Sequence, residues 1–147
     1  MSRNSLGLGF ALVLAATMAG AAQAEPAGNP LAIRNLPPPG AFEVLNSGPD
    51  LRLGAKVRVE RLWRGVWTKL VADVKLVAVC GQENPAPCIG LPSGATLRPP
   101  PWNGFSCGSQ CPASCRANVL AGPGTYRFGV EICGAGEVVF GAPFQKQ

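Results

Sequence analysis

The sequence predicts an all-β protein, an antiparallel β-sandwich of about seven short strands with a long cysteine-rich loop. Three observations support this prediction. The 147 residues include 19 glycines and 15 prolines, and so many turn-forming residues suit short strands and interrupt helices. Several segments alternate apolar and polar residues, which is the pattern of strands with one buried face. No segment after the N-terminus has the spacing of apolar residues typical of an amphipathic helix.

Residues 1–24 predict a secretory signal peptide. Arg3 gives a basic start, and an apolar run without charge follows from residue 6 to residue 22. The segment Ala22-Gln23-Ala24 then places small residues at the two positions that a signal peptidase reads. We therefore expect cleavage before Glu25 and a secreted or periplasmic protein. No lipid anchor is expected, because no cysteine lies near the cleavage site. No membrane span is expected in the mature chain, since it has no apolar run of the ~18 residues that a spanning helix needs.

The first elements of the mature chain follow from proline and glycine positions. Residues 25–40 are rich in both and predict an extended N-terminal lead, because proline cannot donate to a strand ladder. The predicted domain then covers residues 41–147. Residues 42–45 form its first short strand, and the turn-forming residues 46–50 close it.

A hairpin is predicted over residues 55–71. Residues 56–60 alternate charged and β-branched side chains, Arg64-Gly65 interrupts them, and residues 66–70 resume the strand pattern. A third strand is expected from Asp73 to Cys80. Its inner face would hold four side chains: Val74, Leu76, Ala78 and Cys80.

The later half of the chain predicts two more short strands around one long strand. Residues 95–98 form the first short one, and a long loop follows from Pro99 to Asn118. The clearest strand is 124–133, in which Arg127 and Glu131 face opposite to an apolar set. That set is Tyr126, Phe128, Val130 and Ile132. The segment Glu137 to Phe140 adds a strand, and Phe144 closes the chain.

All six cysteines lie in the mature chain, which we expect to reach an oxidising compartment, so three disulfides are predicted. They are Cys80, Cys88, Cys107, Cys111, Cys115 and Cys133. A metal cluster on the evenly spaced cysteines of segment 107–115 is the alternative. Gly108 and Pro112 oppose the helix that such spacing would need, and zinc sites more often separate paired cysteines by two residues. The pairing stays open. A clip between Cys80 and Cys88 is one arrangement, with Cys133 then paired into the 107–115 group.

The composition excludes several kinds of chemistry. The chain has no histidine, which excludes a Ser-His-Asp or Cys-His nucleophile and any histidine-ligated zinc or copper site. Asp50 and Asp73 are its only aspartates, and its glutamates show no calcium-loop pattern. We therefore expect no cofactor and no catalysis. An enzyme that uses carboxylates alone is the alternative, and it would need two of them to converge in a cleft.

Three segments resemble known domains. Residues 120–130, Leu-Ala-Gly-Pro-Gly-Thr-Tyr-Arg-Phe-Gly-Val, resemble the "G-x-Y-x-F/V" segment of bacterial immunoglobulin-like and fibronectin-III-like domains. Residues 61–67 look like their "L-x-x-G-x-W" hairpin, and residues 91–94 look like their "L-x-P-G" strand entry. The resemblance covers about residues 41–145 and implies an immunoglobulin-like sandwich. It also implies that the Tyr126 hydroxyl makes a hydrogen bond back to the preceding corner.

The resemblance extends to secreted bacterial proteins that carry this domain, and these bring no established activity with them. A looser likeness exists to the BsuPI-type proteinase-inhibitor domain. The chain departs from that type in its cysteine-rich insertion, residues 107–115.

The segment after Pro99-Pro100-Pro101 is a candidate binding surface. Three prolines stiffen the approach to Trp102, Asn103 and Phe105, and a preordered tryptophan is a favourable interface anchor. The alternative is structural: Trp102 and Phe105 would form a roof over the core.

A basic cluster is the second candidate surface. Its cations are Arg52, Lys56, Arg58, Arg61, Arg64 and Lys69, with Glu60 as the only acid among them. Arg58 and Arg64 are the candidate contacts for an unknown protein or an anionic component of the cell envelope. Nucleic acid is not an expected partner outside the cell. The alternative is a solvated face whose charges protect a sheet edge from aggregation.

These observations together predict a secreted, disulfide-stabilised protein that acts as a binding or structural module without catalysis. A peptidase inhibitor that presents the 99–115 loop is the alternative.

The intact mass of the exported protein tests the predicted maturation. We expect a chain that begins at Glu25, because small residues occupy the peptidase site at 22–24. A folded, exported product that retains residues 1–24 would contradict the predicted localisation.

Overall fold

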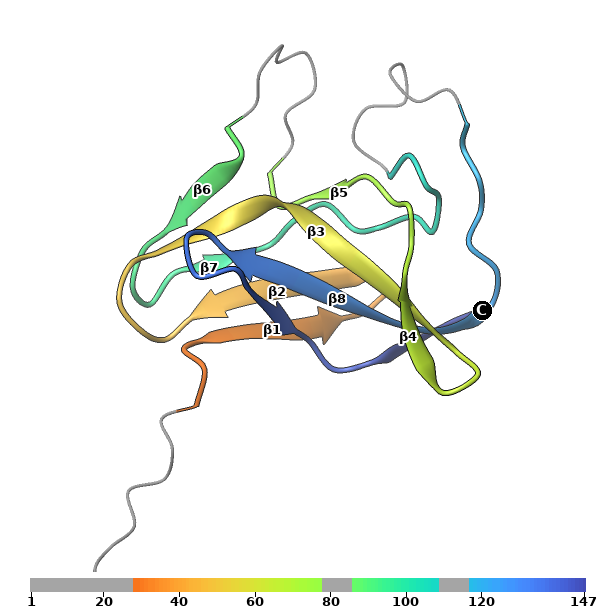
Figure 1. The fold of residues 1–147 in the computed structure, drawn as a ribbon, viewed down its shortest axis with the longest axis horizontal. Helices are drawn as coiled ribbons and strands as arrows, with labels where there is room; N and C mark the ends of the chain where they lie inside the picture. Colours follow the sequence, from red (N-terminus) through yellow and green to blue (C-terminus); the bar gives the residue numbers. More distant parts are fainter. Residues whose placement is uncertain (1–27, 78–85, 109–116) are drawn as a thin grey trace, which may run out of the picture.

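A computed structural model describes residues 28–77, 86–108 and 117–147 (Figure 1). The predicted signal peptide lies outside these residues. The described chain folds into two antiparallel sheets, of three and seven strands, and has no helix. The predicted all-β class is therefore confirmed. Within the described ranges, no helix is long and apolar enough to cross a membrane.

The smaller sheet has the strand order β1-β2-β7. Its strands are β1 (Leu31–Leu36), β2 (Ala41–Asn46) and β7 (Thr96–Leu97). Two long strands, β3 (Leu51–Trp63) and β8 (Gly124–Ile132), pair at the centre of the larger sheet. The other edge of β3 pairs with β4 (Val66–Lys69), β5 (Val74–Lys75) and β6 (Cys88–Leu91). The other edge of β8 pairs with β9 (Glu137–Phe140) and β10 (Phe144–Lys146).

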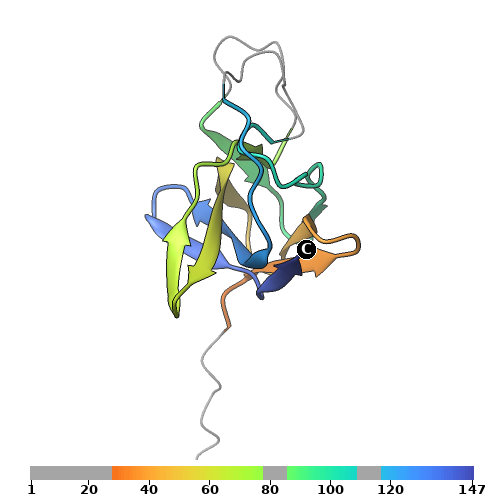
Figure 2. The same ribbon diagram turned by 90° about the vertical axis from the view of Figure 1, so that its right-hand side faces the viewer.

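The larger sheet is strongly curled, as the two perpendicular views show (Figures 1 and 2). The pairing of β3 with β8 shifts register between Leu53 and Val57, and such a bulge bends a strand and increases its twist. The fold thus combines a short sheet of three strands with a larger sheet of seven strands, which is curled into a half-closed barrel. The sandwich arrangement and its immunoglobulin-like form stay predictions.

Both sheets contribute to one aromatic core. The Phe128 ring stacks on Phe42 of the smaller sheet at 4.3 Å between centroids, and on Phe144 of β10 at 4.8 Å. Trp102 meets Tyr126 and Phe128 edge to face, at 5.4 and 6.2 Å. Aromatic pairs in these geometries stabilise a core beyond the effect of their buried area.

The predicted hairpin and the predicted long strand are confirmed. Arg64 and Gly65 form the turn between β3 and β4 with positive φ angles of 50° and 81°, which is the geometry of a tight hairpin turn and favours glycine. Tyr126, Phe128 and Val130 are fully buried, as the alternation of β8 predicts. The Tyr126 hydroxyl donates a hydrogen bond to the carbonyl of Gly122, which confirms the corner predicted for this tyrosine.

The boundaries of two predicted segments were wrong. Residues 31–36 of the predicted lead form β1, whose Leu31 and Ile33 are buried, because the prolines lie outside this stretch and its alternation is intact. The strand predicted over 73–80 is β5, Val74–Lys75, within the described residues. Val74 and Leu76 are buried as predicted, whereas Ala78 and Cys80 lie outside the described residues. β6 was not predicted.

The predicted clip between Cys80 and Cys88 was wrong, and so was the pairing of Cys133 with the 107–115 group. Cys88 on β6 is bonded to Cys133, directly after β8, with 6.5 Å between their Cα atoms. Both strands pair with β3, and this brings the two cysteines together. The bond closes a loop of 45 residues, which contributes about 4 kcal/mol in the chain-entropy estimate.

Cys107 is also disulfide-bonded. A bonded Cys107 is not available as a thiolate ligand, which opposes the metal-cluster alternative for segment 107–115. Cys80, Cys111 and Cys115 lie outside the described residues. No cysteine within the described ranges is free.

Replacing Trp102 by alanine tests its place in the core. Trp102 is 4% exposed and packs on two aromatic rings, so Trp102→Ala should reduce the free energy of unfolding by about 3–5 kcal/mol. Trp63→Ala is the matched control, because Trp63 is 55% exposed, and it should cost less than about 1 kcal/mol. Equal losses in urea unfolding of the two variants would contradict this description of the core.

Candidate ligand-binding site

The candidate residues of the proline-led loop serve the fold. The Nε1 of Trp102 donates to the carbonyl of Phe105 at 2.9 Å, and its backbone amide donates to the carbonyl of Gly40 at 2.9 Å. Asn103 accepts a hydrogen bond from the amide of Phe105 at 3.0 Å. Phe105 forms an isolated bridge with Leu120. The structure therefore matches the predicted alternative, in which Trp102 roofs the core.

The two candidate arginines lie apart. Arg64 is in the exposed turn at the tip of the β3–β4 hairpin, where its guanidinium is 5.9 Å from the Trp63 ring. Arg58 lies on the outer face of β3, six residues away along an extended strand, or roughly 20 Å. The structure brings Arg58, but not Arg64, into a group of charged side chains.

That group is centred on Glu60, which is only 2% exposed. Oε1 of Glu60 forms an ion pair with Nε of Arg58 at 2.7 Å. Its Oε2 accepts two hydrogen bonds from Arg127 of β8, from Nη2 at 2.6 Å and from Nε at 2.8 Å. Two cations therefore compensate one buried carboxylate, and the group has a net positive charge.

Aromatic side chains cover this charged group. The Arg127 guanidinium lies 4.2 Å from the centre of the Trp67 ring on β4 and 3.9 Å from that of Phe140 on β9. Phe140 reaches this place because its strand neighbour is Gly129. A Cβ atom at that glycine would come within 2.6 Å of the Phe140 ring. The rings exclude water from the ion pair and hold the arginine in one position.

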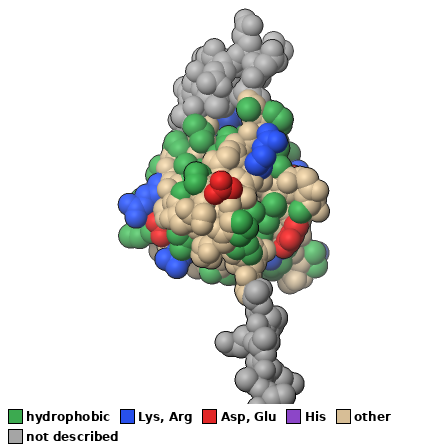
Figure 3. Space-filling model, turned by 90° about the vertical axis from the view of Figure 1, so that its left-hand side faces the viewer, with side chains coloured by type: hydrophobic (Ala, Val, Ile, Leu, Met, Phe, Trp, Pro, Cys, Tyr) green, Lys and Arg blue, Asp and Glu red, His purple; other side chains and the backbone are tan. Residues whose placement is uncertain are grey.

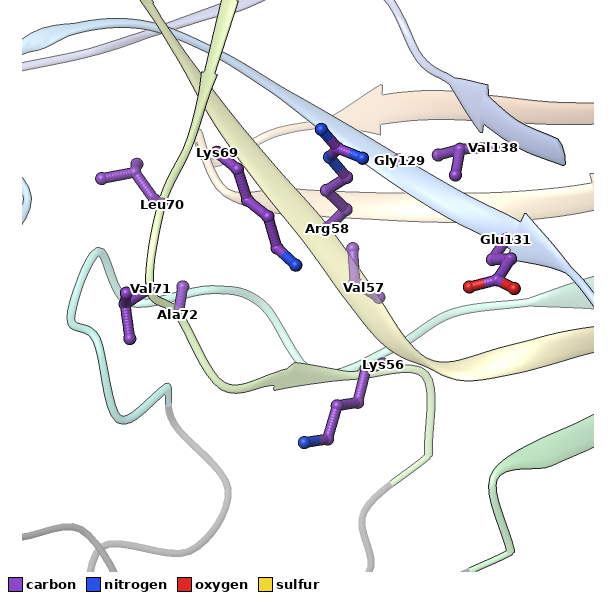
Figure 4. Close-up of a pocket in the computed structure, with 10 residues that line it drawn as sticks. All are labelled: Lys56, Val57, Arg58, Lys69, Leu70, Val71, Ala72, Gly129, Glu131 and Val138. Atoms are coloured by element: carbon purple, nitrogen blue, oxygen red, sulfur yellow. The ribbon is translucent and has the colours of Figure 1, made fainter. Parts of the chain in front are cut away.

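A groove of about 640 Å³ opens beside this group on the outer face of the larger sheet (Figure 4). Lys56 and Arg58 of β3 and Lys69 of β4 line it, together with Glu131 of β8. Apolar walls complete it; they include Val71, Ala72 and Val138. In Figure 4 the Lys69 side chain extends over the groove from β4, and Glu131 faces it from β8.

The electrostatics of this groove favour an anion. Three cations and one carboxylate line it, and Arg58 has already engaged Glu60 through its Nε. Within the described chain, no carboxylate oxygen lies within 4.0 Å of the Nζ atoms of Lys56 or Lys69. By contrast, the face of the molecule in Figure 3 shows both basic and acidic side chains among uncharged ones. The groove is thus a concave surface with a concentrated positive charge.

The described residues give little support for a metal site or for a pair of facing carboxylates. No three histidine, cysteine, aspartate or glutamate side chains among them lie close enough to hold a metal ion. Glu131 is the only carboxylate that lines the groove, as far as the structure describes it. The pair of facing carboxylates that a glycosidase uses is not present at this site.

The sequence identified only part of this site. It placed Lys56, Arg58 and Lys69 in one basic cluster, and the alternation of β3 put the first two on the wet face. It did not identify Gly129 or Glu131, which β8 brings next to them. Their only signal was that a glycine and an acid occupy outward positions of the clearest strand.

Comparisons of the chain with protein-family models, with curated proteins and with solved structures found no match. The resemblance to immunoglobulin-like domains therefore stays a prediction, and the function is argued from the site alone.

Replacing Glu60 tests the charged group. Glu60→Gln keeps the shape but removes the compensating charge of Arg127, whose side chain is 23% exposed. We expect a loss of about 1–3 kcal/mol in the free energy of unfolding, the cost of leaving a partly buried polar group without its partner. Glu137→Gln, at an exposed position of β9, should change stability by less than about 0.5 kcal/mol. Similar urea midpoints for the two variants would show that the ion pairs do not support the sheet.

Proposed function

We propose that the protein is an exported, disulfide-stabilised, non-catalytic binding module that takes an anionic partner in the groove on the outer face of the larger sheet. One observation carries this proposal. Lys56, Arg58 and Lys69 come from two adjacent strands and line a concave surface that has one carboxylate, Glu131.

The arrangement suits recognition of anionic oxygen atoms. Arg58 is oriented by its ion pair with Glu60 through Nε, which leaves its two terminal nitrogen atoms for a ligand. A preoriented guanidinium loses less side-chain entropy on binding than a free one does. Lys56 and Lys69 add two point charges on flexible stems, which adapt to the spacing of anionic groups along a partner.

The groove is open and has a strand floor, so the partner that suits it is an extended polyanion. An acidic polysaccharide of the cell envelope has this extended form, and an exported protein would encounter it. The apolar walls at Val71 and Val138 supply contact area that simple counterions do not use. The peptidase-inhibitor alternative depends on the 99–115 loop, whose residues 109–115 lie outside the described residues.

Titration calorimetry with polygalacturonate, a carboxylated polysaccharide, tests the proposal. The double variant Lys56→Gln, Lys69→Gln should bind at least about tenfold more weakly than the unaltered protein, since each removes a cation from the groove. Binding should also weaken as salt rises, because open ion pairs are screened.

The matched control is Arg34→Gln, Arg52→Gln. It removes the same charge at exposed positions of β1 and β3 that do not line the groove. An equal loss in both double variants would reduce the effect to overall charge. Stronger binding to polyglutamate than to polygalacturonate would point to an acidic protein as the partner.

A further inference from the structure

A second groove, of about 590 Å³, is lined by residues 69–72, which also line the first groove, and by residues 119–122. The buried Trp102 contributes to its floor. Its size is within the range of small-molecule sites.

The walls of this groove expose apolar side chains to an unusual degree. Val71 is 90% exposed, Val119 is 65% exposed and Leu120 is 54% exposed. These three are among the seven large apolar residues that are exposed within the described ranges, and all three line this groove. Such a concentration of exposed apolar area marks a surface that a ligand or partner covers.

A cation without a counterion also lines the groove. Nη2 of Arg61 donates to the carbonyl of Pro123 at 2.8 Å, and its guanidinium lies 5.1 Å from the Trp63 ring and 5.8 Å from the Tyr126 ring. Nε of Arg61 is buried without a hydrogen-bond partner. No carboxylate pairs with Arg61 within the described residues. The arginine is therefore held in place with its charge uncompensated.

We propose that this groove binds a single-chain anionic amphiphile of the fatty-acid type. The carboxylate would pair with Arg61, and the acyl chain would cover Val71, Val119 and Leu120. A purely polar anion would leave the apolar walls in water, and a neutral lipid would leave Arg61 without a counterion.

The small number of polar groups on the walls favours an acyl chain over a peptide as the ligand. A peptide would bring backbone amides and carbonyls that need partners. Ser106 is the only hydroxyl that lines the described groove. Its Oγ already donates to the carbonyl of Ala117 at 2.9 Å and accepts from the amide of Val119 at 2.9 Å. An acyl chain needs no such partners.

The two grooves share Lys69 and residues 70–72, so the test of this proposal uses residues that line one groove alone. Arg61 and Val119 line only this groove, and Lys56 and Arg58 line only the polyanion groove. Variants at these four positions can therefore distinguish a failure of one proposal from a failure of the other.

Calorimetric and fluorescence titrations with laurate test the proposal on the full mature chain. We expect saturable binding of one laurate per chain and a change in tryptophan emission, since Trp102 lies at the groove. Dodecanol, which has the same chain without the charge, should bind at least about tenfold more weakly, and acetate should not bind. No saturable binding of laurate, or equal binding of laurate and dodecanol, would overturn the proposal.

Two pairs of variants locate the site. Arg61→Met should weaken laurate binding at least about tenfold and leave dodecanol unchanged, whereas Arg64→Met at the hairpin turn should change neither. Val119→Asp should abolish laurate binding, whereas Val66→Asp, at an exposed valine outside the groove, should not.

Further measurements keep the test decisive. If Arg61→Met does not fold, Arg61→Lys keeps the charge and should retain laurate binding above that of dodecanol. Equal losses in a variant and its control would overturn the site, and so would displacement of laurate by an apolar peptide with a free carboxylate at a lower concentration than laurate itself. Lys56→Gln should leave laurate binding unchanged, and a loss there would place laurate in the polyanion groove instead.

Discussion

The pairing of β3 with β8 fixes both faces of the larger sheet. Its register sets Val59 opposite Phe128 on the core face and Glu60 opposite Arg127 on the outer face. Because side chains alternate across a strand, a slip of one residue would turn the apolar set outward and the charged set into the core. The aromatic core and the positive groove therefore depend on the same backbone hydrogen bonds.

The outer face also supports this register. A buried carboxylate needs partners, and Glu60 gains Arg127 as one of its two because that residue lies directly across from it. Phe140 then covers the pair because Gly129 leaves room above β8. On an ordinary sheet the solvent-exposed face tolerates many substitutions. Here the outer face instead requires that an ion pair, two aromatic rings and one glycine pack together. The arginine that remains at the edge of this group, Arg58, becomes part of the groove.

Local patterns in the sequence predicted the parts of the fold that local physics determines. The Arg64-Gly65 turn and the alternation of β8 require only neighbouring residues, and both predictions hold. The bond between Cys88 and Cys133 depends on which strands flank β3, and spacing along the chain does not contain that information. The same limit applies to Trp102: three prolines indicate a stiff segment, but not whether the ring after them turns toward the core. The glycine and acid that β8 adds to the groove became meaningful only when their strand partners were known.

Residues 70–72 line both proposed sites, and hydrogen bonds at their two ends hold them in place. The amide of Leu70 donates to the carbonyl of Val59 at 2.8 Å, and the amide of Asp73 donates to the carbonyl of Ser106 at 2.7 Å. One bond ties the segment to the central strand and the other ties it to the loop that contains Trp102. A wall held at both ends presents two faces without reordering, so little binding energy is spent on preparing either site. The chemistry of each site then follows from the residues that line it alone: Lys56 and Arg58 of β3 in the first groove, and Arg61 with the apolar segment 119–121 in the second.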